Sequence, residues 1–175
     1  MKALKWLAAV LAALLLVAAG ILVAMASRPG AGTLSGSIEI SASPQAIWPW
    51  LTEPDNLKRW VSWTIEAKRL DDRHLLIILE DPGSPGTRFQ IHDELMTIDP
   101  PRSLTVRFWA ADAFSGDSTY TLEPNGGVTR IRVVSHFRYD RWFARLIEPL
   151  VTPDAQKKEN ADLAVLKKLV EAAPH

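Results

Sequence analysis

Few side chains in this sequence combine a reactive type with an informative position, and the most distinctive of them is the carboxylate of Asp93. It falls on the apolar side of a predicted strand, two residues after Ile91 and two before Leu95. An inward carboxylate costs free energy unless it is paired, hydrogen-bonded or protonated. Asp93 is therefore our candidate for a ligand anchor, or for a proton-transfer group with a raised pKa. We favour the alternative that a bulge turns Asp93 to solvent, or that its carboxylate bonds nearby backbone.

The remaining residue types exclude most other chemistry. The chain has no cysteine, which excludes thiolate zinc sites, iron–sulfur clusters and cysteine nucleophiles. The four histidines, His74, His92, His136 and His175, lack the spacing of metal ligands, and only His92 with His136 offers a surface pair. No serine-nucleophile elbow, phosphate-binding loop or dinucleotide fingerprint occurs. We therefore expect no cofactor and no metal, and Asp93 is the one candidate for a catalytic role if the protein is an enzyme.

The elements that would position these residues begin with an apolar segment, Trp6–Ala26, of 21 residues without a charged or polar side chain. As a helix it would rise about 31 Å, close to the hydrocarbon thickness of a bilayer. Lys2 and Lys5 precede it and Arg28 follows it. The positive-inside tendency then predicts a single-pass membrane protein with a short cytoplasmic N-terminus and an extracytoplasmic domain. Because residues 24–26 also form a small-x-small cleavage site, the alternative is secretion after signal cleavage.

The rest of the chain has the composition of one folded domain. We expect an anchor at residues 1–28, a linker at 29–36 and a domain at 37–175. The whole chain carries 20 basic and 20 acidic residues, and without Lys2, Lys5 and Arg28 the remainder carries 17 against 20, a net charge of −3. Nucleic acid is therefore not an expected partner, because phosphate binding needs a basic excess.

Hydropathy patterns in the domain predict an α+β fold. A first strand at 37–41 leads through Ser43-Pro44, a helix start, into two short helices separated at Glu53-Pro54. Six strands follow at 64–70, 73–80, 86–98, 103–111, 117–123 and 127–138, with Asn125-Gly126 as the strongest hairpin signal. Short links between them favour an antiparallel meander. A final helical region, interrupted at Pro149 and Pro153, supplies an apolar stripe to cover the sheet.

Alternation along the strands assigns one apolar and one polar face. Charges on the polar face are expected to form cross-strand pairs such as Glu94 with Arg107. A cavity under the last helix would be lined by the apolar face, which is interrupted by two polar side chains. The predicted lining residues are Phe89, Ile91, Asp93, Val106, Phe108, Ile131, Val133, Ser135 and Phe137, with Trp48 and Trp63 as an aromatic gate. The alternative for Trp48, Trp50, Trp60 and Trp63 is packing between the helices and the sheet.

Four stretches of the chain resemble one superfamily. Residues 38–60, with Ser43-Pro44 leading through Ile47-Trp48 to Trp60, resemble the opening of START-like (SRPBCC) proteins, which include polyketide cyclase/dehydrase-like proteins. Gly86-Thr87-Arg88-Phe89 opens a long strand as in that family, residues 122–130 resemble its Gly-Gly hairpin, and residues 163–171 resemble its closing helix. The order and spacing of these pieces cover nearly all of residues 37–172.

This resemblance implies a helix-grip fold: a curved antiparallel sheet of about seven strands around a long C-terminal helix, here preceded by one N-terminal transmembrane helix. It also implies a cavity for a hydrophobic small molecule or lipid, but neither a reaction nor catalytic residues. We therefore expect a membrane-tethered, non-catalytic binding protein. The alternatives are a cyclase/dehydratase-like enzyme that uses Asp93 as acid or base, and a protein-interaction module with a vestigial cavity. The sequence leaves the ligand and the oligomeric state open.

Overall fold

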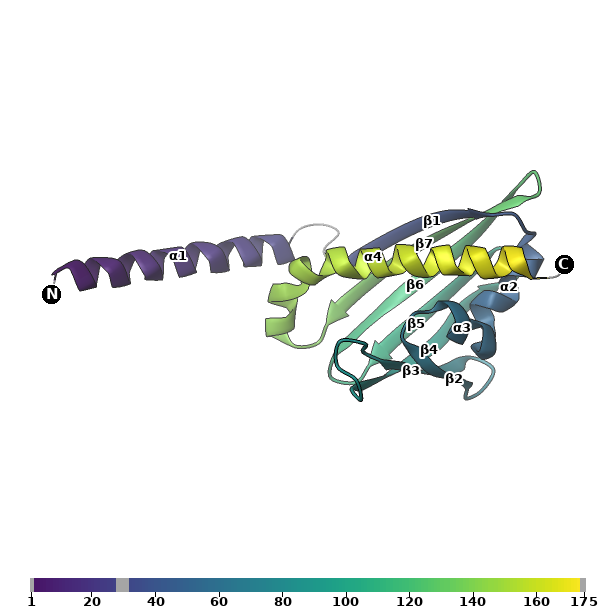
Figure 1. The fold of residues 1–175 in the computed structure, drawn as a ribbon, viewed down its shortest axis with the longest axis horizontal. Coiled ribbons are helices and arrows are strands. Elements are labelled where there is room, and N and C mark those ends of the chain that lie inside the picture. Colours follow the sequence, from purple (N-terminus) through teal and green to yellow (C-terminus); the bar gives the residue numbers. More distant parts are fainter. Residues whose placement is uncertain (1, 28–31, 174–175) are drawn as a thin grey trace.

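The structure, a computed structural model that describes residues 2–27 and 32–173, consists of one projecting helix and a domain built on a single curved sheet (Figure 1). Arg28, residues 29–31 of the predicted linker and His175 lie outside the described residues. The elements in order are α1 (Lys2–Ala26), β1 (Thr33–Ile40), α2 (Pro44–Thr52), α3 (Pro54–Trp60), β2 (Thr64–Arg69), β3 (His74–Glu80), β4 (Arg88–Asp99), β5 (Ser103–Ala110), β6 (Phe114–Asn125), β7 (Val128–Tyr139) and α4 (Trp142–Ala172).

The sheet has the predicted α+β helix-grip arrangement. Its seven antiparallel strands follow the order β1-β7-β6-β5-β4-β3-β2, so β2 to β7 form a meander and β1 closes onto the last strand. β1 begins earlier than predicted, because Thr33 and Gly36 already pair with His136 and Val133 of β7. Residues 33–36 of the predicted linker are therefore part of the sheet, which leaves only residues 27–32 between α1 and the domain.

Turn chemistry and charge pairing set the strand register as the sequence indicated. Asn125 pairs with Val128 across the β6–β7 hairpin, and its two turn glycines have φ values of +61° and +91°. Such positive values favour glycine over residues with a Cβ. On the polar face Arg107 donates to Glu94 at 3.3 Å, which confirms the predicted cross-strand pair.

The predicted break of the last helical region at Pro149 and Pro153 is wrong. Both prolines lie inside α4, which is one helix of 31 residues. Figure 1 shows that its first turns run at a steep angle to the long segment that crosses the sheet. A proline inside a helix removes one backbone hydrogen bond and bends the axis, and the hydroxyl of Thr152, which donates to the Glu148 carbonyl at 2.7 Å, adds a contact at this bend. The helix therefore bends at this point and continues.

The C-terminal half of α4 packs tightly on the sheet. Leu163, Leu166 and Val170 are at most 2% exposed and share one core with Ile131 and Val133 of β7. The helix approaches β1 closely at Gly36, where a Cβ would lie 2.6 Å from Leu163 Cδ1. The two short helices are also joined to each other: the indole of Trp60 in α3 donates to the Trp50 carbonyl in α2 at 2.8 Å.

This packing predicts a position-dependent cost along α4. Leu166→Ala removes a side chain that is 0% exposed, and its cavity should lower the free energy of unfolding by about 2–5 kcal/mol. Val165→Ala is the matched control, because Val165 is 42% exposed and its truncation should change stability by about 0.5 kcal/mol or less. Urea unfolding of the full chain in detergent, followed by tryptophan fluorescence, measures both. Equal losses for the two variants would contradict the observed helix orientation.

Candidate functional site: an apolar cavity under the last helix

A cavity of about 320 Å³ lies between the concave face of the sheet, α2, α3 and the middle of α4. Its walls are mainly aliphatic and aromatic side chains, with a few polar groups among them. The lining residues are Leu34, Leu51, Leu57, Trp60, Val61, Leu75, Ile77, Leu79, Ile91, Asp93, Leu95, Val106, Phe108, Phe114, Ser118, Tyr120, Ser135, Phe137, Tyr139, Ala155, Lys158 and Glu159. This size and lining are typical of sites for small apolar or amphipathic molecules.

Aromatic rings from three strands form a connected cluster in this cavity. Phe114 of β6 meets Phe108 and Tyr139 edge to face, with ring centroids 6.2 and 6.3 Å apart, and Phe137 meets Tyr139 at 5.9 Å. Edge-to-face pairs of this kind are the preferred geometry of aromatic rings and hold them in fixed orientations. The aromatic wall is therefore a pre-formed apolar surface.

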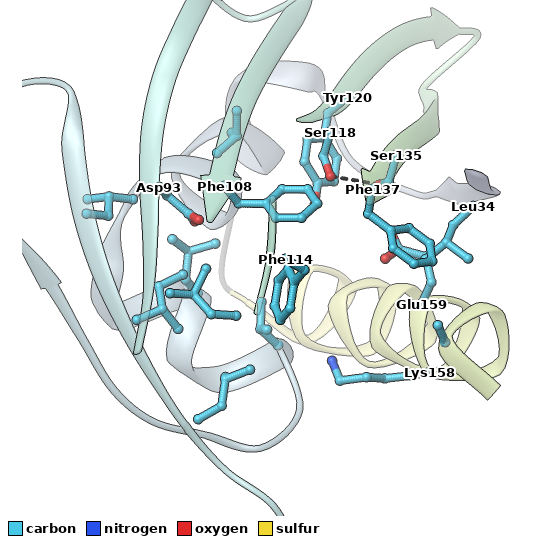
Figure 2. A pocket seen from close by; sticks show the side chains of 18 of the residues that line it. Leu34, Asp93, Phe108, Phe114, Ser118, Tyr120, Ser135, Phe137, Lys158 and Glu159 are labelled. Atoms are coloured by element: carbon cyan, nitrogen blue, oxygen red, sulfur yellow. Dashed lines mark hydrogen bonds between the residues drawn. The ribbon is translucent and has the colours of Figure 1, made fainter. Parts of the chain in front are cut away.

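The two serines of the cavity satisfy each other. Ser118 Oγ on β6 lies 2.7 Å from Ser135 Oγ on β7, and both residues are buried (Figure 2). Each hydroxyl still has capacity for a further hydrogen bond, since a hydroxyl is one donor with two acceptor lone pairs. Tyr120 lies nearby on β6, and burial, with Glu159 as a second cause, raises the pKa of its hydroxyl well above the usual value. These hydroxyls remain neutral donors at any physiological pH.

Asp93 is the unusual polar group of the cavity. It lies on β4, opposite Phe108 of β5, and its side chain extends into the cavity (Figure 2). Among the described residues, nothing donates a hydrogen bond to its carboxyl and no cation neutralises it. Burial alone raises the pKa of Asp93 to about 7. The alternative that we favoured from the sequence, a bulge that exposes Asp93, is wrong, because the register shift of β4 lies further on, between Leu95 and Thr97.

The charged residues of α4 form the opposite wall. Lys158 Nζ donates to Asp162 at 2.6 Å and lies 5.3 Å from the ring centroid of Trp63. Asp162 also accepts hydrogen bonds from the backbone N–H and the hydroxyl of Ser62. Lys158 is therefore already paired with a carboxylate. Glu159 is not, and burial, with Asp162 as a second cause, raises the pKa of its carboxyl.

Six of the residues predicted to line a cavity do so: Ile91, Asp93, Val106, Phe108, Ser135 and Phe137. Their contact with a ligand remains a prediction. Five others need correction. Ile131 and Val133 lie on the predicted inner face of the sheet but do not line the cavity. They are 0% and 1% exposed because the C-terminal half of α4 packs on them. Phe89 lies at the start of β4, beyond the part covered by α4, and is 43% exposed.

The proposed aromatic gate also needs correction. Trp48 packs against the core from α2 and Trp63 is 48% exposed with a positive φ of 71°, so neither lines the cavity. Trp50 and Trp60 are buried, as packing between helices and sheet predicts, and Trp60 also contributes to the cavity wall.

Several lining residues were missed, although the sequence carried a signal for some of them. Ser118, Tyr120 and Leu122 alternate along β6 and could have been assigned to the inner face. Likewise, the apolar stripe at Leu163 continues backwards by helical spacing to Glu159 and Ala155. Their polar or small side chains concealed this continuation. The contribution of α2 and α3 had no sequence signal beyond their own amphipathic pattern.

His74, His92 and His136 are not among the residues that line the cavity. His92 stacks on Trp109 with ring centroids 5.4 Å apart, and His136 Nδ1 lies 3.1 Å from the hydroxyl of Thr33. β5 and β6 separate their strands. Within residues 2–27 and 32–173, no group of three or more acidic, histidine or cysteine side chains could hold a metal ion.

A curved antiparallel sheet closed by a C-terminal helix over an apolar cavity defines a START-like, helix-grip protein. The sequence profile of the family described as "Polyketide cyclase / dehydrase and lipid transport" matches residues 31–171. The chain therefore belongs to this family. No curated protein matches the chain.

Solved structures of low sequence identity share the fold. A conserved protein from Geobacillus kaustophilus is 15% identical, with a TM-score of 0.69 over 82% of this chain and 97% of that protein. A protein from Chromobacterium violaceum is 18% identical, with a TM-score of 0.68 over 81% and 99%. A Thermus thermophilus protein is 20% identical, with a TM-score of 0.63 over 82% and 99%. These similarities support the fold of the domain.

The buried carboxyl predicts a pH-dependent stability. In the unfolded chain the pKa of Asp93 is near its ordinary value of 3.8, and in the folded protein it is about 7. Between these two pH values the folded state therefore binds the proton more tightly than the unfolded state. Stability should therefore fall as pH rises from about 4 to about 7, by at most about 4 kcal/mol from this group. Asp93→Asn keeps the shape without the ionisation. The variant should gain stability over the wild type at pH 8 and little at pH 4.

Urea unfolding of both proteins at several pH values measures this difference. Glu159→Gln is a useful comparison, because it removes the other cavity carboxyl whose pKa is raised. Its effect on the pH dependence of stability should be smaller. A wild type and an Asp93→Asn variant whose stability curves run parallel from pH 4 to pH 8 would show that Asp93 is solvated in the folded protein.

Proposed function

We propose that this protein is a membrane-tethered binder of a hydrophobic or lipid-like small molecule, held in the cavity under α4 without covalent chemistry. The observation that carries the proposal is the cavity of about 320 Å³, walled by aromatic and aliphatic side chains. The family description, which includes lipid transport, supports a ligand of this kind. Burial of apolar ligand surface would supply most of the binding free energy.

The polar groups of the cavity would orient the ligand. Asp93 has no hydrogen-bond partner among the described residues, so a ligand hydroxyl or amide that bonds it removes a cost already present in the empty protein. The Ser118–Ser135 pair and Tyr120 supply further donors and acceptors. The preferred ligand is then an amphipathic molecule whose neutral polar end reaches Asp93.

The N-terminal helix supports the tether. Residues Lys5–Ala24 form a helical stretch long and apolar enough to cross a bilayer, and none of it is buried against the rest of the protein. The family profile begins after this helix, at residue 31, so α1 is an addition to the matched domain. A domain held at the bilayer surface meets membrane-soluble molecules at a raised effective concentration. The alternative role of this segment is a cleaved signal sequence.

One observation favours an enzyme as the second candidate function. A carboxyl with a pKa of about 7 can act as acid or base at neutral pH, which suits a cyclase or dehydratase reaction in the same cavity. Asp93→Asn separates the two. A pure binder keeps its ligand with altered affinity, whereas an enzyme retains substrate and loses turnover.

Native mass spectrometry of the detergent-extracted full chain tests the proposal directly. We expect a bound molecule that survives removal of the micelle and is released as a lipid-like species on collisional activation. Ala155→Trp places a large side chain in the cavity wall and should lower ligand occupancy about tenfold or more. Ala164→Trp, on the exposed side of the same helix, is the control and should keep the ligand.

Two results would contradict the proposal. One is a wild-type protein that is repeatedly empty after extraction in several detergents and that takes up no added long-chain alcohol. The other is equal occupancy in the Ala155→Trp and Ala164→Trp variants when both unfold at the same urea concentration as the wild type. The first result would favour the interaction module, and the second would place the ligand outside the cavity.

A further inference from the structure

The end of α1 lies beside the first turns of α4. In Figure 1 the C-terminal end of α1 meets these turns at one end of the domain, and the two helices are in contact. The six residues 27–32 that separate α1 from β1 can span at most about 25 Å when fully extended. If α1 crosses a bilayer, its C-terminal end marks the membrane surface. The first turns of α4 are then held at that surface.

The composition of these first turns suits a membrane–water interface. In sequence, residues 142–151 contain Trp, Phe, two Leu, Ile and Val, with Arg141 before them and Arg145 among them. Aromatic residues and arginines are enriched at bilayer interfaces, and helices of this composition lie in the plane of the membrane. The segment therefore resembles an interfacial helix more than a surface helix in water.

The exposed side chains of the segment agree with its composition. Ile147 and Leu150 are 47% and 57% exposed and stand three positions apart, so they lie on one face of the helix. The acidic residue between them, Glu148, is turned inward and is only 7% exposed. Arg145 donates to the carbonyls of Tyr139 and Asp140. The outer face of these turns thus carries large apolar side chains, Ile147 and Leu150, that the described part of the chain leaves exposed.

We infer that the first turns of α4, residues 142–150, dock on the phospholipid bilayer that α1 crosses and hold the near end of the cavity at the membrane surface. The inference rests on the proposed role of α1 as an uncleaved anchor. The occupant of the apolar face is the bilayer itself, because the covalent link and the α1–α4 contact bring lipid to this face before any other partner.

The cavity reaches the same end of the domain. Leu34, the second residue of β1, and Tyr139, the last residue of β7, both line it. Leu34 follows α1 after a short link, and Tyr139 precedes α4 by two residues. A lipid-like molecule would therefore pass between the bilayer and the cavity with little exposure to water. This arrangement gives the anchor a second role, since it orients the domain as well as retaining it.

Site-directed spin labelling tests the inference in the full-length chain. Because the sequence has no cysteine, one introduced cysteine is the only thiol and carries the only nitroxide. Ile147→Cys and Leu150→Cys probe the proposed interface in nanodiscs of phosphatidylcholine and phosphatidylglycerol. Leu14→Cys in α1 is the membrane control, and Val165→Cys, on the far half of α4, is the water control. Collision with oxygen reports the bilayer, and collision with a water-soluble nickel chelate reports water.

We expect labels at 147 and 150 to collide mainly with oxygen, as at 14, and the label at 165 to collide mainly with nickel. Labels at 147 and 150 that match the label at 165, while 14 reports the bilayer, would overturn the docking and leave the proposed cavity function intact. A label at 14 that reports water would overturn the tether and the docking together. Ligand retention, measured separately by mass spectrometry, would be unaffected by either result.

Discussion

The structure depends on one helix that covers a curved sheet unevenly. The C-terminal half of α4 presents Leu163, Leu166 and Val170, which fill the space above β1 and β7 completely. Its middle presents Ala155, Lys158 and Glu159, which leave space between the helix and the strands. The same element therefore supplies the stability of the domain and the boundary of its cavity. This division permits a hollow of about 320 Å³ in a domain of ordinary size.

The carboxyl of Asp93, unpaired among the described residues, is the observation that most favours a ligand or a reaction in this hollow. A half-buried carboxyl that faces an apolar cavity without a hydrogen-bond partner costs free energy, and this cost is a measurable part of a marginal stability. Groups of this kind are concentrated at functional sites, where a ligand or a reaction supplies the missing partner. Lys158, the lysine of the cavity lining, is paired with Asp162.

Much of the fold could be predicted because it follows from local patterns. Alternation identified the strands and put Asp93 on the inner face, and Asn125-Gly126 fixed the hairpin register. The hollow itself could not be located, since Ile131 and Phe137 share one face of β7 and only the crossing point of α4 decides which is covered. The prolines of α4 misled because local chemistry disfavours proline inside a helix, whereas here the helix bends and continues through both prolines.

Binding in the cavity can be seen by anomalous diffraction from crystals of the full chain grown with 12-bromododecan-1-ol. We expect a bromine peak inside the cavity, an alkyl chain along Phe108 and Phe114, and a hydroxyl within hydrogen-bond distance of Asp93. Bromine found only at the lipid-exposed surface of α1, with the cavity closed by its own side chains, would contradict this expectation.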